Sequence, residues 1–251
     1  FCCNMVYRPA VYMKTIYWTN ISTTRTLDGG TPGSEQYDIP PLSYFDPVIL
    51  KSSLPESTQN ITYLRCPAFT ELSRNTFALK FPFDYEIEIN EQGAITKDLD
   101  QKFYDMFLAF SENVLQLKSA YLFVSEDSLM MSISHPYLHS NRVTKFGNAL
   151  GGEYDIGQWA RPVLCSLLIH ENPSVLDLHR GDVYSYVKFH TKDKLTLKKF
   201  EYTQAIDTIV TDCWQMKNSS RKIIPLKLCY DVYTRHRYHK RIIKEIKKNI
   251  I

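Results

Sequence analysis

Two neighbouring stretches, Ala120-Tyr-Leu-Phe-Val124 and Leu129-Met-Met-Ser-Ile-Ser134, decide the fold class of this chain. The first is a short apolar run of the kind that fills a sandwich core. The second alternates apolar and polar residues with the period of a half-buried strand. The polar turn Ser125-Glu-Asp127 lies between them. Together they predict two short strands joined by a turn, the basic unit of an antiparallel sheet.

Four further segments predict strands because they alternate in polarity or form short apolar runs bounded by turn residues. These segments are residues 85–89, 162–169, 183–189 and 195–200. Short strands with regular turns between them are typical of all-antiparallel architectures. We therefore expect a mainly β (α+β) chain that forms one antiparallel β-sandwich or jelly-roll-like domain.

The hydrophobic period changes near the C-terminus, which predicts helices there. Apolar residues between 206 and 214 recur at helical spacing, with Thr203 as a plausible cap and Asn218 as a plausible stop. A second helix is expected over about 228–250. Its apolar stripe consists of Ile242, Ile243, Ile246 and Ile250.

The chain divides into four expected segments. Residues 1–12 precede Met13 and are a candidate non-native N-terminal extension. Residues 13–60 begin with a predicted strand and continue as a Pro- and Gly-rich arm. We expect this arm to wrap over the body, anchored by Tyr37, Ile39, Leu42, Tyr44 and Phe45. Residues 61–202 form the predicted β-sandwich core. Residues 203–251 form the C-terminal helices with their basic tail.

Composition excludes several classes of protein. With 44% hydrophobic and 23% charged residues among 251, the chain is neither disordered nor collagen-like nor a coiled coil. Its six cysteines include no C-x-x-C pair, so reduced thiols are expected. No apolar run is long enough to span a bilayer, and no stretch has the pattern of a secretory signal. We therefore expect no membrane span.

Charge is distributed unevenly along the chain. Residues 221–251 contain ten Lys and Arg against two Asp and Glu, a net charge of +8. Because the whole chain carries +3, the other 220 residues carry −5. Cations neutralise phosphates and aromatic rings stack on unpaired bases, so the tail is a candidate nucleic-acid-binding segment. Its candidate contacts are Arg235, Arg237, Tyr238, Lys240 and Arg241. The competing interpretation is a solvated helix face, or a face docked on the acidic body.

A cupin-like metal enzyme of the oxygenase type is an alternative function. Its ligands would come from His135, His139, Asp182 and His190, with a divalent metal as cofactor. No histidine has a carboxylate two residues later, so the His-x-Asp/Glu pattern of the oxygenase facial triad is absent. Surface or hydrogen-bonded histidines are the competing interpretation. Our leading expectation is a protein without cofactor and without enzymatic activity.

The cluster Trp159-Ala-Arg161-Pro162 stands at the entrance to a predicted strand. Arg161 could stack on Trp159 or pair with a carboxylate such as Asp155 or Asp182. One interpretation is a binding pocket that includes Trp159, Arg161 and Asp155. The other is a corner clasp that orients two strands.

Three stretches together resemble an uncharacterised protein family of tailed phages, of the marine and cyanophage type, and of some bacteria. They are residues 63–69 (YLRCPAF), 154–163 (YDIGQWARPV) and 179–189 (HRGDVYSYVKF), and the resemblance spans roughly residues 13–215. The family has no established activity. The resemblance therefore implies a viral source, with the host cytoplasm or the virion as location. We expect a non-enzymatic binding or virion-assembly module whose partner is a host or viral macromolecule.

Overall fold

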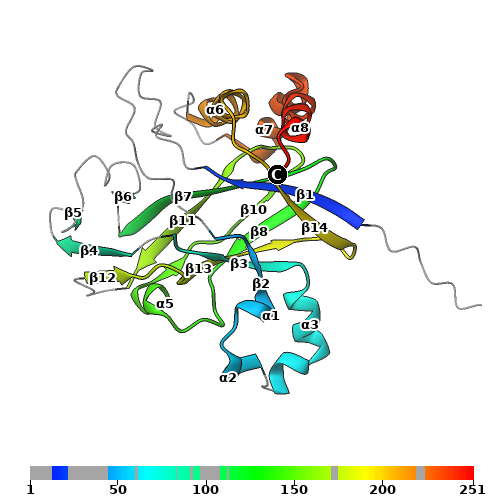
Figure 1. Cartoon of the computed structure of the whole chain (residues 1–251). Helices are drawn as coiled ribbons and strands as arrows, with labels where there is room; N and C mark the ends of the chain where they lie inside the picture. The colour runs from blue at the N-terminus through cyan, green and yellow to red at the C-terminus, as the bar shows by residue number, and fades with distance from the viewer. Residues whose placement is uncertain are drawn as a thin grey trace, which may run out of the picture.

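The described part of the chain contains three sheets (Figure 1). The computed structural model describes residues 13–21, 45–59, 62–82, 84–90, 93–96, 108–111, 113–170, 175–218 and 224–251. The expected extension 1–12 and the arm's remaining expected anchors (Tyr37, Ile39, Leu42 and Tyr44) lie outside these residues. The described part is mainly β, with helices on opposite sides of the sheets.

The largest sheet has six strands and is mixed rather than purely antiparallel. Its order is β14 (Lys194–Lys199), β1 (Met13–Asn20), β7 (Val114–Ser125), β11 (Pro162–Ile169) and β9 (Gly147–Ala149), with β6 (Leu108–Ser111) also paired to β7. β1 runs parallel to β14 and antiparallel to β7. One expectation is corrected here, because the sheet contains a parallel pair. β1, the strand predicted at the start of residues 13–60, lies inside this sheet between β14 and β7.

The other two sheets are antiparallel in every pair described. The five-stranded sheet has the order β10 (Gly152–Asp155), β8 (Met130–Ser134), β13 (Val183–Phe189), β3 (Thr76–Lys80) and β2 (Val48–Ile49). The three-stranded sheet has the order β12 (Val175–Leu178), β4 (Tyr85–Asn90) and β5 (Gly93–Thr96). The strands expected from polarity and apolar runs are all confirmed, with ends that shift by one or two residues or extend further, as at the start of β7.

Aromatic side chains join the two larger sheets into one core. Phe123 of β7 meets Phe189 of β13 edge-on, with ring centroids 5.4 Å apart. Phe77 of β3 packs on the same Phe189 ring at 5.8 Å. Residues 121–124 are all fully buried because β7 is covered on both faces. That double cover explains why residues 121–124 of this strand are all apolar rather than apolar at every second position.

Short helices lie on the far side of the five-stranded sheet, the first two within the expected arm (residues 13–60) and the next two within the expected core (residues 61–202). They are α1 (Leu50–Ser53), α2 (Glu56–Gln59), the 3-10 turn η1 (Thr62–Arg65) and α3 (Pro67–Ser73). Phe45 anchors the described end of the arm, as expected. Its carbonyl accepts a hydrogen bond from the Tyr121 hydroxyl at 2.6 Å, and its ring lies beneath the guanidinium of Arg180 at 4.7 Å. A further helix, α5 (Arg142–Phe146), follows β8.

The C-terminal helices lie together over the six-stranded sheet (Figure 1). α6 (Gln204–Asn218) matches the expected first helix. The expected second helix is in fact two, α7 (Leu226–Arg235) and α8 (Tyr238–Lys248). The chain breaks at Arg237, whose φ of 56° is left-handed and cannot continue a helix. No described helix has both the length and the apolar character needed to cross a membrane.

Candidate functional site

The four candidate metal ligands lie apart. Asp182 and His190 stand just before and just after β13. A strand rises about 3.3 Å per residue, so their backbones are separated by roughly 25 Å. One ion cannot bind both side chains. The Asp182 carboxylate instead accepts a hydrogen bond from the backbone N–H of His179, and His190 Nε2 lies 2.9 Å from the Ser132 hydroxyl.

Both remaining histidines are engaged in structural hydrogen bonds. His135 Nδ1 accepts from the backbone N–H of Ala149 at 3.0 Å. His139 lies with Nδ1 2.5 Å from the Tyr186 hydroxyl and Nε2 3.0 Å from the Ser53 carbonyl. Nε2 must donate to that carbonyl, so Nδ1 accepts from Tyr186 and neither ring nitrogen has a lone pair left for a metal. Within the described ranges, no three His, Cys, Asp or Glu side chains form a group that could hold a metal ion.

Burial lowers the pKa of these two histidines, so the stability of the fold should depend on pH. It lowers the pKa of His135, with His170 adding to the effect, and it lowers the pKa of His139 against a smaller opposing effect of the hydrogen bond to Ser53. The unfolded chain, with an ordinary histidine pKa of 6.5, then binds protons at a pH where the folded chain does not. The free energy of unfolding should therefore fall as pH decreases through and below that value.

We expect replacement of both side chains by His135→Asn and His139→Asn to make this pH dependence shallower. Asparagine keeps an acceptor oxygen near each Nδ1 position but does not titrate. Chemical denaturation at several pH values between neutral and mildly acidic measures the effect. An unchanged slope in the double variant would contradict the assignment.

Asp155 is a clasp and not a pocket residue. Its buried carboxylate accepts four hydrogen bonds from the loop around it, donated by the Ser128 hydroxyl, the backbone N–H groups of Leu129 and Gly157, and the Gln158 amide. Burial acts to raise the pKa of Asp155, and these hydrogen bonds outweigh it, so the pKa lies below its ordinary value. The corner-clasp interpretation therefore holds for Asp155, which fixes the turn after β10.

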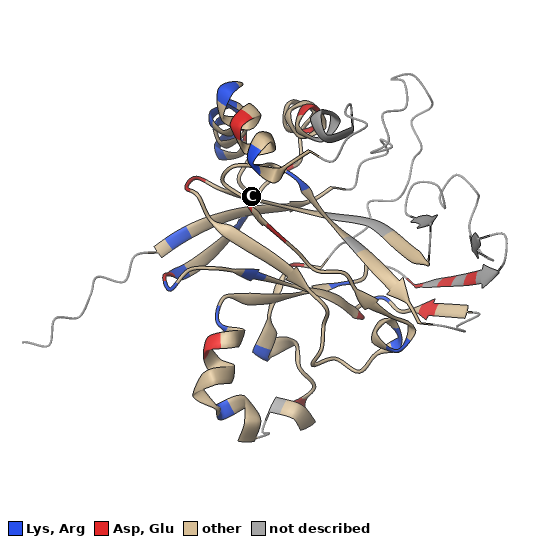
Figure 2. Ribbon diagram, turned by 180° about the vertical axis from the view of Figure 1, so that it is seen from behind, with Lys and Arg blue, Asp and Glu red and all other residues tan. Residues whose placement is uncertain are grey.

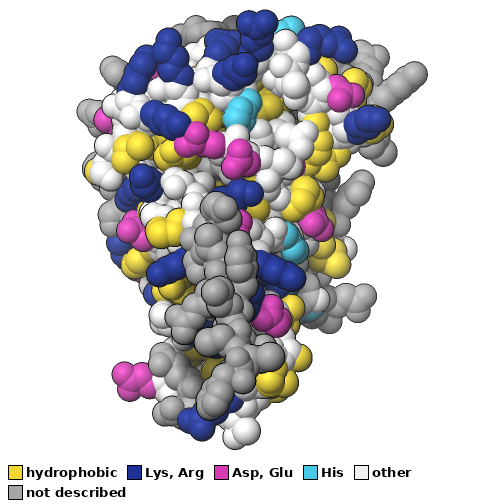
Figure 3. Space-filling view, turned by 90° about the vertical axis from the view of Figure 1, so that its right-hand side faces the viewer, with side chains coloured by type: hydrophobic (Ala, Val, Ile, Leu, Met, Phe, Trp, Pro, Cys, Tyr) yellow, Lys and Arg dark blue, Asp and Glu magenta, His cyan; other side chains and the backbone are white. Residues whose placement is uncertain are grey.

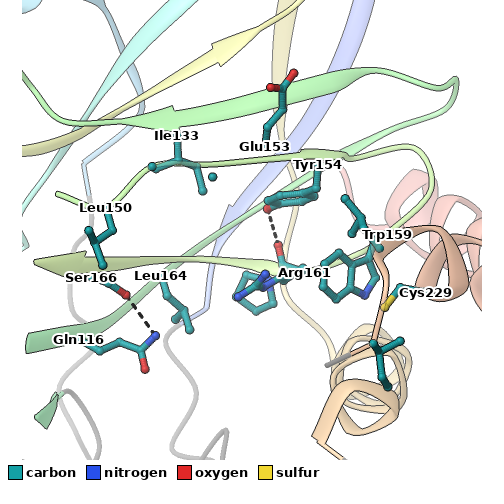
Figure 4. A pocket seen from close by; sticks show the side chains of 15 residues that line it. Gln116, Ile133, Leu150, Glu153, Tyr154, Trp159, Arg161, Leu164, Ser166 and Cys229 are labelled. Atoms are coloured by element: carbon teal, nitrogen blue, oxygen red, sulfur yellow. Dashed lines mark hydrogen bonds between the residues drawn. The ribbon is translucent and has the colours of Figure 1, made fainter. Parts of the chain in front are cut away.

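Trp159 and Arg161, by contrast, do line a cavity. The Arg161 guanidinium lies over the Trp159 ring, 5.1 Å from its centroid, as one of the two sequence-based alternatives expected. The cavity has a volume of about 370 Å³ and opens between β11, the β8–β10 pair and the start of α7 (Figure 4). Its other lining residues are Gln116, Ile133, Leu150, Gly151, Gly152, Glu153, Tyr154, Pro162, Leu164, Ser166, Ile224, Leu226 and Cys229.

Strand alternation explains the residues of this cavity that the sequence interpretation missed. Pro162, Leu164 and Ser166 occupy every second position of β11 and line the cavity, while Val163 and Leu167 point into the core. The polar Ser166 within an otherwise apolar strand was the available signal that one side of β11 is not fully covered.

Basic residues between 235 and 248 lie on α7, on α8 and at the bend between them. Ile242, Ile243 and Ile246 are buried in the core, so they fix α8 to the body along one side. The cations on the remaining surface are exposed: Arg235, Arg237, Lys240, Arg241, Lys244, Lys247 and Lys248. We call these seven residues the basic face. Figures 2 and 3 show Lys and Arg gathered at this end of the molecule.

One cation at the edge of the basic face helps to hold α8 on the body of the protein. Lys247 pairs with Glu126 at 2.7 Å, and Glu126 also accepts from the Tyr17 hydroxyl at 2.6 Å. The pKa of Glu126 is lowered, chiefly by these two hydrogen bonds. Among the described residues, Arg235, Arg237, Lys240 and Lys244 form no ion pair. Docking on the acidic body therefore uses only part of the basic face.

An aromatic stack stands beside these cations at the bend between α7 and α8. The His236 and Tyr238 rings are stacked, with centroids 5.6 Å apart and 27° between their planes. The Arg241 guanidinium lies over the other part of this stack, 5.4 Å from the Tyr238 centroid. His236 is exposed and Tyr238 is half-buried. The left-handed Arg237 places this stack on the surface, since a continuous helix would have spread the rings around its circumference.

Comparisons with known proteins leave these sites to be interpreted from their own geometry. No protein-family model, no curated protein and no solved structure matches this chain.

Proposed function

We propose that this protein is a non-enzymatic β-sandwich module of phage type that binds nucleic acid through the basic face of α7 and α8. Two larger sheets with one shared aromatic core support the sandwich description. The phage source rests on the family resemblance alone. Nucleic acid is a viral macromolecule present in both expected locations, the host cytoplasm and the virion.

One observation carries the binding proposal. The apolar side of α8 is used for docking, while four neighbouring cations, Arg235, Arg237, Lys240 and Lys244, remain exposed and form no ion pair within the described structure. Lys240 and Lys244 are one helical turn apart, a rise of about 6 Å along α8. Such a row can follow a phosphate backbone. The exposed His236 ring offers a stacking surface for an unpaired base, which favours single strands.

A binding titration tests the proposal with intact protein. The variant carries Arg235→Gln, Arg237→Gln, Lys240→Gln and Lys244→Gln, and a labelled oligothymidylate is followed by fluorescence anisotropy. We expect its affinity to fall roughly tenfold or more at low salt, because each neutralised phosphate contact contributes through counterion release.

A matched variant controls for net charge. Lys51→Gln, Arg65→Gln, Lys145→Gln and Lys192→Gln remove the same charge from exposed positions on other elements. This control should bind within about twofold of wild type. Equal losses in both variants would mean that binding follows overall charge and not the basic face. Absence of binding by the wild-type protein at low salt would reject the proposal outright.

A further inference from the structure

Strand β14 stands at an edge of the six-stranded sheet. Among the described strands it pairs with β1 alone, and it is at one end of the strand order (Figure 1). The Phe200 N–H donates to the Trp18 carbonyl of β1. Because successive residues of a strand direct their backbone groups to opposite sides, Leu195 and Leu197 direct theirs away from β1. No described residue hydrogen-bonds these outward groups, so they are open to an incoming strand.

The outer side of β14 already accepts an antiparallel segment at its end. Ile250 forms an antiparallel bridge with Phe200, and the Ile251 N–H donates to the Lys199 carbonyl at 3.0 Å. The geometry of β14 therefore suits strand pairing on this side. A strand that continues from this bridge runs antiparallel to β14 and exchanges its next pair of hydrogen bonds with Leu197.

The side chains of β14 alternate between apolar and polar. Leu195 and Leu197 share one face and pack against the core, but they are only partly buried. Lys194 and Lys198 lie on the other face, are exposed and form no ion pair with a described residue. The two lysines are four residues apart, a separation of about 13 Å along the strand. An incoming strand thus meets two apolar positions on one face and two cations on the other.

Charge decides which strand fits this edge. If a second copy paired antiparallel through β14, Lys194 of one chain would lie opposite Lys198 of the other. Like charges directly opposite each other destabilise a strand pair, and lysine on an edge strand protects against such self-association. The same two lysines stabilise a strand that carries Asp or Glu opposite them. The edge therefore favours an acidic strand over a second copy of this chain.

We infer that the β14 edge binds an extended acidic segment of a partner protein by strand addition. The segment runs antiparallel to β14 and has acidic residues opposite Lys194 and Lys198 and apolar residues opposite Leu195 and Leu197. Main-chain hydrogen bonds to the two leucines contribute affinity, and the side-chain pattern contributes specificity. This site lies on a different element from the basic face and does not depend on the nucleic-acid proposal.

Three labelled peptides test the inference, each titrated into intact protein and followed by fluorescence anisotropy. The first is Gly-Ser-Glu-Val-Thr-Val-Glu-Ser-Gly, the second has both Glu replaced by Lys, and the third has both Val N-methylated. We expect the acidic peptide to bind roughly tenfold or more tightly than the lysine peptide, because two attractive cross-strand pairs become repulsive. N-methylation should abolish binding, since it removes the N–H groups that donate to the carbonyls of Leu195 and Leu197.

A charge reversal on the protein makes the result specific to β14. The variant Lys194→Glu with Lys198→Glu should prefer the lysine peptide. Lys51→Glu with Lys145→Glu makes the same charge change at exposed positions of other elements and should keep the wild-type preference. Thermal unfolding of both variants checks that the fold is retained.

Four outcomes would overturn the inference. They are equal affinity of wild type for the acidic and lysine peptides, undiminished binding of the N-methylated peptide, an unchanged preference in the β14 variant, and no binding of the acidic peptide to wild type. Sedimentation of the wild type tests the other occupant. Self-association that Lys194→Glu with Lys198→Glu abolishes would assign the edge to a second copy and would likewise contradict an acidic partner.

Discussion

Replacement of Phe123 by Ala is expected to lower the free energy of unfolding by about 3–5 kcal/mol, the range for removing a buried aromatic side chain. Phe123 is fully buried and its ring meets Phe189 across the two larger sheets at 5.4 Å. The loss combines the transfer free energy of the ring with the cavity left between the sheets. Urea denaturation followed by circular dichroism measures it.

An exposed aromatic residue gives the comparison. Tyr63 is 58% exposed on η1, so Tyr63→Ala should change the free energy of unfolding by less than about 1 kcal/mol. A Phe123→Ala cost as small as that of Tyr63→Ala would contradict the shared core. The sandwich description in the proposed function depends on this result.

Asp155→Ala is expected to cost about 3 kcal/mol, because it leaves the buried N–H groups of Leu129 and Gly157 without their acceptor and each such loss costs roughly 1–3 kcal/mol. Those two bonds are 2.9 and 2.8 Å long. Asp155→Asn keeps one acceptor oxygen and should cost less. The neighbouring Asp127 is exposed, and Asp127→Ala should be nearly neutral.

The pH dependence of Asp155 gives an independent check. Its pKa in the folded chain lies below the ordinary value of 3.8. Its contribution is therefore complete above pH 3.8 and is lost as pH falls below that value. Acid unfolding of the Asp155→Ala variant should consequently depend less on pH in this range. A cost of Asp155→Ala equal to that of Asp127→Ala would mean that the clasp does not hold the β10 turn.

Local patterns predicted the strands well but not their partners. The polarity pattern of residues 183–189 and the apolar run of residues 120–124 follow from which positions are buried. Such a pattern can be read from residues that are adjacent in the sequence. The parallel pairing of β1 with β14 joins residues far apart in the chain, and no local pattern encodes such a partner. The break at Arg237 carries no Gly or Pro, so the helical period continued across it in the sequence.

Two of the three candidate pocket residues line the cavity, and part of the metal hypothesis could be judged from the sequence. Trp159 and Arg161 were identifiable because they stand immediately before a predicted strand, and a cation and an aromatic ring this close in sequence can stack on each other. The hydrogen-bond donors to Asp155 could not be identified from the sequence, since all four belong to a loop whose turns only the structure reveals. Asp182 and His190, however, flank a predicted strand, and its length alone separates them.

The basic face is the central claim, and its most direct test is the salt dependence of oligonucleotide binding. Truncation at the C-terminus is unsuitable because it would remove Ile242, Ile243 and Ile246 from the core. The logarithm of affinity is measured against the logarithm of salt concentration for wild type, the four-cation variant of α7–α8 and the matched control.

Each contact with a single strand contributes about 0.7 to the slope, so losing four contacts should reduce its magnitude by about 3. The matched control should keep the wild-type slope. If the slopes of all three proteins are the same, nucleic acid does not bind at the basic face and the proposed function is wrong.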